Sequence, residues 1–178
     1  MKKIIALLIL TLGYTTTFSQ VKELPKDNGY LVKVGDQAPD DFELVLANGR
    51  KTNLKELRGK VVVLQFTASW CVVCREEMPH LEKDVWKAYQ HKNFELIGVD
   101  RDEPLATVKK FEKDMKITYP LALDPGADIF GRFADKKSGV TRNVVIDKTG
   151  KIVYLTRLYD KEEFEGMVKA IDRLVNAT

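Results

Sequence analysis

The stretch VVVLQFTASWCVVCREEMP, residues 61–79, decides the fold of this chain. Residues 61–66 are apolar except for Gln65, and their length and β-branching predict a buried strand. Apolar residues then recur at helical intervals from Cys71 to about Gln90, at Met78, Leu81, Val85 and Tyr89. Two cysteines separated by two residues therefore stand where a buried strand gives way to a helix.

This position favours redox chemistry at the two cysteines. The first turn of a helix has unpaired N–H groups and a positive dipole end, which stabilise a thiolate. Cys74 lies one helical turn beyond Cys71, close enough to form a disulfide with it. We therefore interpret Cys71 as the attacking nucleophile and Cys74 as the more buried resolving thiol.

Three other uses of a CxxC pair fit the sequence less well. A zinc site lacks a second CxxC, and only His80 and His91 are available as further ligands. Haem attachment needs histidine directly after the second cysteine, where this chain has Arg75. A structural disulfide would close so short a loop that it would remove little chain entropy. We expect no metal and no cofactor.

Working outward, the hydrophobic pattern predicts further strands and helices in a single domain. Asn48-Gly49 indicates a hairpin turn after a strand with Phe42, Leu44 and Leu46. Leu54 and Leu57 suggest a short helical turn closed by Gly59. The other expected strands are 94–99, 144–146 and 151–155, with 119–124 as a connection or short strand; the other expected helices are 102–116, 129–133 and 162–175.

The N-terminus has the pattern of a secretory signal. Lys2 and Lys3 precede an apolar run from Ile4 to Leu12, and small residues at 17 and 19 fit cleavage after Ser19. We expect residues 1–19 to be a signal peptide and 20–178 the domain of a periplasmic protein. An uncleaved anchor is the alternative, although the run is short for a bilayer.

The charge balance gives no sign of a nucleic-acid partner. The chain of 178 residues has 29 basic and 26 acidic residues, a net charge of +3. Residues 1–19 contain two lysines and no acid, so the mature chain has a net charge of +1. We expect neither nucleic-acid binding nor a membrane-surface patch.

Four segments resemble the TlpA/ResA branch of the thioredoxin superfamily. They are DFEL at 41–44, LKELRGK at 54–60, FTASWCVVCREEMP at 66–79 and IDKTG at 146–150. The resemblance covers nearly all of residues 36–175, and Pro79, five residues after Cys74, is its most specific feature beside the CxxC. Such a proline kinks the first helix.

The resemblance implies an α/β, thioredoxin-like fold. Its central mixed β-sheet is flanked by helices and has an N-terminal β-hairpin extension and a central insertion, here around Glu103 to Leu123. The implied activity is that of an extracytoplasmic thiol–disulfide oxidoreductase. Relatives usually reduce disulfides in other proteins, apocytochrome c among them, and receive electrons from a membrane-embedded thiol donor.

The chain departs from the family pattern at three positions. Thr67 replaces a frequent tryptophan, and Gln65 replaces the buried acid of thioredoxins proper. Because Gln65 cannot titrate, protons must move through water or another carboxylate. Glu76, Glu77 and Glu82 are candidates, but we expect each to lie on a solvated helix face.

The third departure is Thr141, which aligns with the cis-proline that faces the CxxC in the family. A cis bond costs about 2.5–4 kcal/mol before a residue other than proline, so we predict a trans Val140–Thr141 bond. The Thr141 hydroxyl would then donate a hydrogen bond to the Cys71 thiolate. We assign Thr141 to the substrate-binding region, together with a partly exposed Trp70.

Two further predictions concern aromatic and charged residues outside the motif. Trp86 is expected to pack against a helix or the core. The charge run Asp100-Arg101-Asp102-Glu103 has no interpretable spacing, and we treat it as a solvated loop.

Two other functions stay open. A peroxiredoxin-like thiol peroxidase would have threonine and proline at positions occupied by Ala68 and Leu64, and its arginine would fall on Thr141, one residue before Arg142. A non-catalytic thioredoxin-fold binding module is the second alternative, against which the intact CxxC argues.

Overall fold

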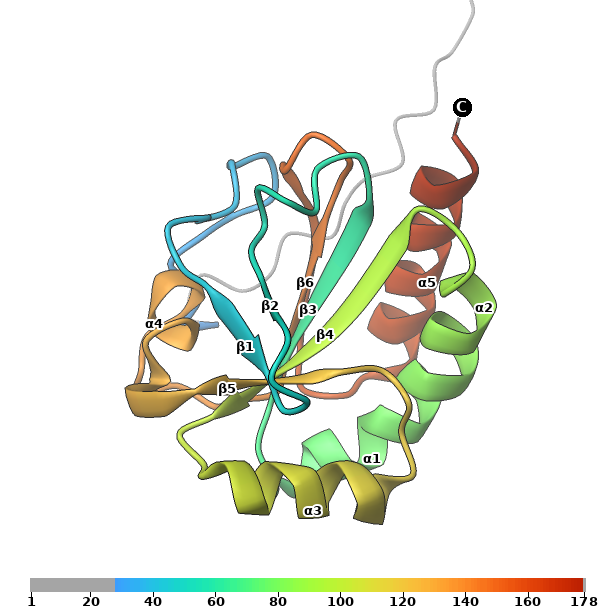
Figure 1. Ribbon diagram of the computed structural model, residues 1–178. Helices are drawn as coiled ribbons and strands as arrows, with labels where there is room; N and C mark the ends of the chain where they lie inside the picture. Colours follow the sequence, from blue (N-terminus) through green and yellow to red (C-terminus); the bar gives the residue numbers. More distant parts are fainter. Residues whose placement is uncertain (1–27, 178) are drawn as a thin grey trace, which may run out of the picture.

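A seven-stranded sheet in the order β2-β1-β5-β4-β3-β6-β7 forms the centre of the computed structural model, which describes residues 28–177 (Figure 1). The strands are β1 Leu44–Leu46, β2 Lys51–Thr52, β3 Val61–Thr67, β4 Phe94–Arg101, β5 Leu121–Asp124, β6 Arg142–Ile146 and β7 Ile152–Arg157. β3, β4 and β5 are mutually parallel, whereas β1, β6 and β7 pair antiparallel with their neighbours. The predicted mixed sheet is confirmed.

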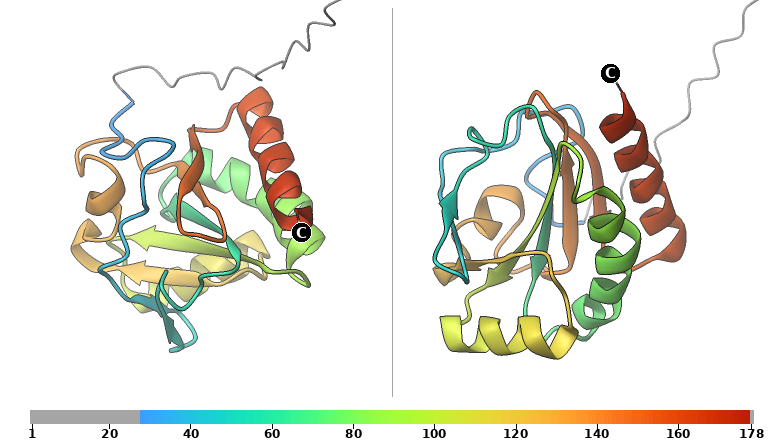
Figure 2. Two further views of the ribbon diagram at one scale, coloured as in Figure 1. Left: turned by 90° about the horizontal axis from the view of Figure 1, so that it is seen from above. Right: turned by 45° about the vertical axis from the view of Figure 1, so that its right-hand side comes forward.

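The helices cover both faces of this sheet. They are α1 Val72–His80, a π-helical segment Leu81–Trp86, α2 Lys87–Tyr89, α3 Leu105–Met115, α4 Phe130–Phe133 and α5 Lys161–Asn176, with a 3₁₀ turn at Pro125–Ala127. Figure 1 and the right panel of Figure 2 place α5 and α2 on one face, α4 on the other, and α3 across one end. None of the helices within residues 28–177 is both long and apolar enough to cross a membrane.

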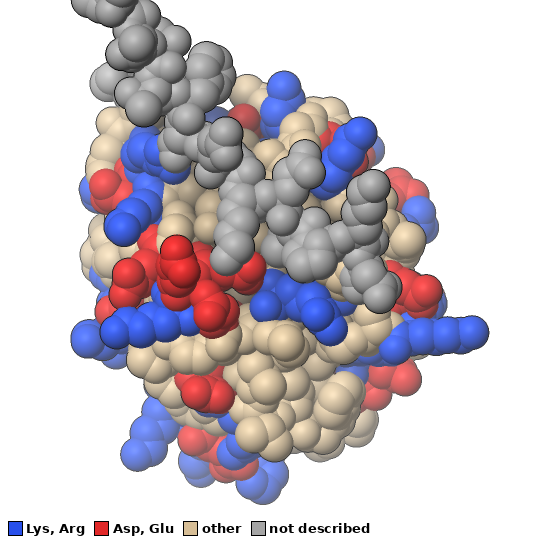
Figure 3. All heavy atoms as spheres, turned by 180° about the vertical axis from the view of Figure 1, so that it is seen from behind, with Lys and Arg blue, Asp and Glu red and all other residues tan. Residues whose placement is uncertain are grey.

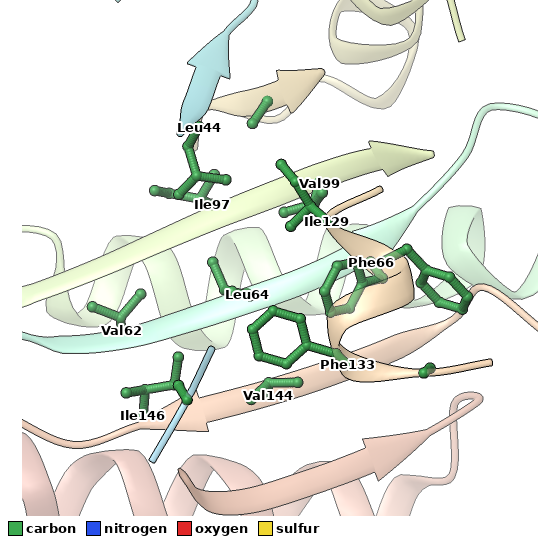
Figure 4. Close-up of a cluster of buried hydrophobic side chains, with 14 of the residues drawn as sticks. Leu44, Val62, Leu64, Phe66, Ile97, Val99, Ile129, Phe133, Val144 and Ile146 are labelled. Atoms are coloured by element: carbon green, nitrogen blue, oxygen red, sulfur yellow. The ribbon is translucent and has the colours of Figure 1, made fainter. Parts of the chain in front are cut away.

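The alternation of β3 divides the core into two clusters. Val62, Leu64 and Phe66 face α4, where the Phe66 ring packs edge-on against Phe130 with centroids 5.4 Å apart (Figure 4 shows this cluster). Val61 and Val63 face the α1 and α5 side. Since every residue of β3 is buried, the strand anchors the chain that leads to the cysteines.

The hairpin and the central insertion both extend the sheet beside β4. Gly49 has φ +88°, and the Arg50 N–H donates to the Asn48 side chain, as a tight turn requires. β1 pairs with β5, which follows α3, so the hairpin and the insertion lie next to each other. Residues 54–59 form successive turns rather than the predicted helical turn.

The register of the central strands brings the important loops together at one edge. β3, β4 and β5 all end at the edge where α1 and α3 begin. Phe66 on β3 pairs with Arg142 on β6, so Thr141 lies beside the end of β3. The loop before β6 is therefore held next to the start of α1.

The surface mixes both signs of charge. Figure 3 shows lysine and arginine side chains interspersed with acids on the rear face, and an area free of both in its lower part. In Figure 1, α1 and α3 lie at that end of the molecule. The predicted signal peptide, residues 1–19, and its cleavage site lie outside the described residues.

Candidate functional site: a cysteine pair at a helix start

Cys71 caps the N-terminus of α1. Its backbone is extended, with φ −85° and ψ 109°, and its Sγ accepts a hydrogen bond from the Cys74 N–H at 3.2 Å. Cys71 is 9% exposed and Cys74 is fully buried, and both are free thiols in this structure. The reactive edge of the pair is therefore the Cys71 sulfur.

Thr141 lies against both sulfurs. Its Oγ1 is 3.1 Å from the Cys71 Sγ and 3.1 Å from the Cys74 Sγ. No peptide bond among residues 28–177 is cis, so the Val140–Thr141 bond is trans, as the sequence predicted. A proline at this position has no hydroxyl and could form no hydrogen bond with either sulfur.

The two thiols have different pKa values because their surroundings differ. A hydrogen bond from the Cys74 thiol, aided by bonds from Thr141 and from the N–H groups of Cys74 and Val73, lowers the pKa of Cys71 to about 6 against the opposing effect of burial. The bond that Cys74 donates to Cys71, together with burial, raises the pKa of Cys74 well above its ordinary value. Near neutral pH, Cys71 is the thiolate and Cys74 the thiol.

Glu77 is a buried carboxyl group one turn beyond Cys74, which corrects the prediction of a solvated side chain. It is 1% exposed and accepts hydrogen bonds from Asn143 Nδ2 at 2.6 Å and Gln65 Nε2 at 3.2 Å. Burial raises its pKa to about 7, although the two amide donors oppose the shift. Gln65, which cannot titrate, therefore holds a carboxyl group that can.

The other two glutamates of this helical segment differ from each other. Glu76 is exposed, as predicted. Glu82 is 5% exposed, so the prediction of a solvated face is wrong there. Its carboxylate accepts from the Thr118 N–H at 2.9 Å and hydroxyl at 2.7 Å, which ties the π-helical segment to the connection before β5.

Apolar side chains surround the exposed edge of Cys71. Trp70 is 62% exposed and Val72 is 76% exposed, on either side of the cysteine. Leu158 is also exposed, and its N–H donates to the Thr141 carbonyl at 3.0 Å. These residues form an apolar rim, and the exposure of Trp70 agrees with the prediction.

Trp86 is half-buried and donates to the Thr118 hydroxyl.

The charge run 100–103 is not the solvated loop that the sequence suggested. Asp100 is fully buried at the end of β4. Glu103 accepts hydrogen bonds from both the Ser69 N–H and the Ser69 hydroxyl, two residues before Cys71. The available signal was the position of Asp100 directly after a buried strand, at the edge where the cysteines lie.

Arg142 does not approach the sulfurs in the way a peroxidase arginine would. Its guanidinium stacks on the Tyr30 ring at 4.5 Å and donates to the carbonyls of Gly139 and Asn28. Thr141, the preceding residue, occupies the place beside the cysteines. In the described part of the chain, no group of three or more His, Cys, Asp or Glu side chains could hold a metal ion.

Comparisons with known proteins agree with this geometry. The family model described as "AhpC/TSA family" matches residues 34–155. A thiol-disulfide oxidoreductase ResA of Bacillus cereus is 34% identical over 141 residues, which are 79% of this chain and 79% of that protein. ResA of Bacillus anthracis is 33% identical over 170 residues, covering 95% and 94% of the two chains.

Solved structures give the same picture. A proposed protein disulfide isomerase from Bacteroides thetaiotaomicron superposes with a TM-score of 0.81 at 55% identity, covering 84% of this chain and 94% of that one. A proposed thiol:disulfide interchange protein DsbE from Chlorobium tepidum has a TM-score of 0.69 at 26% identity, covering 82% and 99%. The resemblance found in the sequence motifs is confirmed.

Proposed function

This chain belongs to the AhpC/TSA family and is a thiol–disulfide oxidoreductase, and on that premise we propose that it reduces disulfides of extracytoplasmic proteins through Cys71 and Cys74. The observation that carries the proposal is the difference between the two sulfurs. Cys71 is a helix-capping thiolate with 9% of its surface exposed, whereas Cys74 is a fully buried thiol.

In the first step the Cys71 thiolate attacks one sulfur of a substrate disulfide. The substrate S–S bond breaks, a Cys71–substrate disulfide forms, and the other substrate sulfur leaves as a thiolate. In the second step Cys74 loses its proton and attacks the Cys71 sulfur. The Cys71–Cys74 disulfide forms, the second substrate thiolate leaves, and two electrons have passed to the substrate.

The second step needs an acceptor for the Cys74 proton. Glu77 is suited to this role because it is buried on the same helix, one turn away, and its pKa of about 7 allows it to gain and lose a proton near neutral pH. Thr141 supports the first step, since its hydroxyl can donate to the Cys71 thiolate while the sulfur is unreacted. The side-chain amides of Gln65 and Asn143 hold the Glu77 carboxyl group in place, and the Thr141 hydroxyl contacts both sulfurs. These contacts support the two assignments.

The apolar rim of Trp70, Val72 and Leu158 favours a protein substrate. An uncharged surface around the nucleophile can pack against the side chains that flank a disulfide in an unfolded or flexible chain. Thr141 is buried against both sulfurs, and its carbonyl accepts from the N–H of Leu158 in this rim. The proposed substrate class is therefore disulfide-bonded protein segments.

The location and electron supply complete the proposal. The signal-like residues 1–19 support export to the periplasm, with cleavage near Ser19. Mass measurement of the chain from the periplasm of a bacterial host checks this, since a mature chain should begin at Gln20. A membrane-embedded thiol donor would return two electrons to the Cys71–Cys74 disulfide, as the family resemblance implies.

Reduction of insulin disulfides, with dithiothreitol as electron source, tests the activity. The mature protein should accelerate insulin reduction, and the Cys71→Ser and Cys74→Ser variants should each lose the catalytic rate. Hydrogen peroxide consumption under the same conditions should stay at the background rate. Rapid peroxide consumption without insulin reduction would instead support a thiol peroxidase, and inactivity in both assays would support a binding module.

A further inference from the structure

A buried series of hydrogen bonds runs from Tyr119, in the connection before β5, to Glu77 on α1. The Tyr119 hydroxyl donates to Gln65 Oε1 at 2.8 Å, and Gln65 Nε2 donates to Glu77 Oε2 at 3.2 Å. All three side chains are buried, those of Tyr119 and Gln65 completely. Because Gln65 lies on β3, the series joins the central insertion to the helix that carries the cysteines.

Strand β4 leaves room for this series of hydrogen bonds at Gly98. Gly98 pairs with Gln65 across the two parallel strands. A Cβ atom on Gly98 would lie 3.4 Å from the Tyr119 ring and 3.5 Å from Gln65 Oε1, and it would collide with the side chain of Leu121. A glycine inside a strand is typical of a place where other groups approach the backbone closely. The strand therefore accommodates the contact between Tyr119 and Gln65.

The Tyr119 phenol determines which end of the Gln65 amide faces Glu77. Burial raises the pKa of Tyr119 well above its ordinary value, so the hydroxyl keeps its proton and needs an acceptor. Of the two ends of the amide only the oxygen accepts, so Oε1 faces Tyr119 and the donor Nε2 faces Glu77. A carboxylate is stabilised by a donor, whereas an amide oxygen in the same place would require Glu77 to keep its proton. The orientation in the structure therefore favours the carboxylate.

The other amide that contacts Glu77 lacks such an anchor. Asn143 Nδ2 donates to Glu77 Oε1 at 2.6 Å and to the Thr156 hydroxyl at 2.9 Å. The oxygen of the same amide, Oδ1, has no hydrogen-bond partner among the described residues. Of the two amides that donate to Glu77, Gln65 is therefore the one that is held from both ends.

The ionisable groups around these residues come from several elements. The Cys71 thiolate raises the pKa of Glu77, and Cys74 keeps its proton at neutral pH. The charge of Glu82, on the π-helical segment, opposes the ionisation of Tyr119. Two more neighbours are phenols that stay neutral because burial raises their pKa values, Tyr30 before β1 and Tyr159 after β7. In the oxidised protein the cysteines form a disulfide, so neither of them titrates together with Glu77.

We propose that Tyr119 is a positioning residue for the proton transfer to Glu77. Its hydroxyl fixes the Gln65 amide with the donor end toward the carboxyl group, so the carboxylate is favoured. The inference rests on the proposed role of Glu77 as proton acceptor. In that step the Cys74 sulfur forms a bond to the Cys71 sulfur, the substrate leaves as a thiolate, and the Cys74 proton passes to Glu77. Tyr119 thereby keeps the acceptor available at neutral pH.

The chemical shift of the Glu77 carboxyl carbon, titrated by NMR in the oxidised protein, tests the positioning directly. Tyr119→Phe keeps the ring and removes the hydroxyl, so Gln65 Oε1 loses its donor and the amide turns this oxygen toward Glu77. We expect the pKa of Glu77 to rise by about one to two, the effect of losing a hydrogen bond to a charged group.

Tyr89→Phe is the matched control for the loss of a buried hydroxyl. Tyr89 belongs to the same core cluster as Tyr119, but its hydroxyl donates to Asp172 and has no contact with Gln65. The pKa of Glu77 should therefore equal that of the parent in Tyr89→Phe.

A second pair of variants shows whether Tyr119 acts through Gln65. Gln65→Leu removes the amide, so Glu77 loses this donor and its pKa should rise whether or not Tyr119 has its hydroxyl. Adding Tyr119→Phe to Gln65→Leu should therefore cause no further shift. An effect of Tyr119 that bypassed the amide would instead be retained in the double variant.

Release of substrate from the Cys71 mixed disulfide connects the positioning to the reaction. In Tyr119→Phe the midpoint of the pH dependence of release should move upward by as much as the pKa of Glu77. At a pH well above both midpoints the release rate should equal that of the parent, because Glu77 is then ionised in both proteins.

Two results would overturn the proposal. They are an unchanged Glu77 pKa in Tyr119→Phe, and a shift of the same size when this change is added to Gln65→Leu. A raised Glu77 pKa with the parent pH profile of release would contradict the proposed role of Glu77 as proton acceptor, while confirming that Tyr119 controls its ionisation. The carbon titration and the release profile thus distinguish a failure of the positioning from a failure of the proposed function.

Discussion

Thr141 carries one hydroxyl hydrogen between two sulfur atoms, so it can donate to only one of them at a time. The Cys71 thiolate is the stronger acceptor, because a charged acceptor strengthens a hydrogen bond. The Cys74 thiol holds its proton at neutral pH and donates it to the same thiolate. A hydroxyl at this position therefore favours a state in which the two cysteines differ in charge.

Replacing Thr141 with valine keeps the branched shape and removes the hydroxyl. We expect Thr141→Val to raise the pKa of Cys71 by about one, equivalent to ~1.4 kcal/mol, because the thiolate loses a donor. Thr141→Ser, which keeps the hydroxyl, should stay close to the parent value. Thiolate absorbance titrated against pH measures both, and an unchanged pKa in the valine variant would show that the hydroxyl does not stabilise the thiolate.

Glu77 gives a second prediction at the scale of one residue. If its carboxylate accepts the Cys74 proton, release of substrate from the Cys71 mixed disulfide should accelerate as the pH rises through about 7. The sign follows from the ionisation: the base is present above the pKa and absent below it. Glu77→Gln should slow this step and remove the dependence on pH in that range.

Stopped-flow measurement of single-turnover release is the appropriate assay for that step. The exposed neighbour Glu76 supplies the control, since Glu76→Gln alters the charge of the same helix without entering the buried network. A Glu77→Gln variant that retained the parent pH profile would exclude Glu77 as the proton acceptor.

At the scale of elements, the helix that carries the cysteines is fixed at both ends. Cys71 caps its start. Beyond Pro79 the chain continues as a π-helical segment, in which Glu82 accepts two hydrogen bonds from Thr118. Because Thr118 lies in the connection before β5, this contact joins the cysteine-bearing helix to the central insertion.

Removing the Glu82 carboxylate should loosen that junction. We expect Glu82→Ala to lower the free energy of unfolding by about 2–3 kcal/mol, because the two partly buried hydrogen bonds from the Thr118 N–H and hydroxyl lose their charged acceptor. Glu76→Ala, on the exposed face of α1, should change it by less than about 0.5 kcal/mol. Urea unfolding of the two variants gives both values, and equal stabilities would mean that Glu82 contributes no more than a surface residue.

At the scale of the whole molecule, hydrophobic periodicity was sufficient to predict the strands, the main helices and the place of the cysteines between β3 and α1. The pattern could not predict which charged residues are buried. Glu77 and Glu82 are hydrogen-bonded by Asn143 and Thr118, which lie 66 and 36 residues away in sequence. A helical spacing assigns such residues to the solvent face, and only the packing of distant segments corrects it.

For Thr141, in contrast, its position in the sequence was enough to predict that it lies beside the cysteines. Alignment on Ile146-Asp147 put it beside the CxxC, and the cost of a cis bond predicted the trans geometry that the structure has. Its contact with Cys74 as well as with Cys71 was not predicted. The three-dimensional register of β6 against β3 supplies that contact.

The most direct test of the central claim is the capture of a mixed disulfide with a disulfide-bonded protein substrate such as insulin. Cys74→Ser should accumulate a covalent complex through Cys71, because no second thiol can release the substrate, and peptide mass mapping should locate the bond at Cys71. Cys71→Ser should accumulate none. Capture by the Cys71→Ser variant through Cys74, with none by Cys74→Ser, would contradict the account.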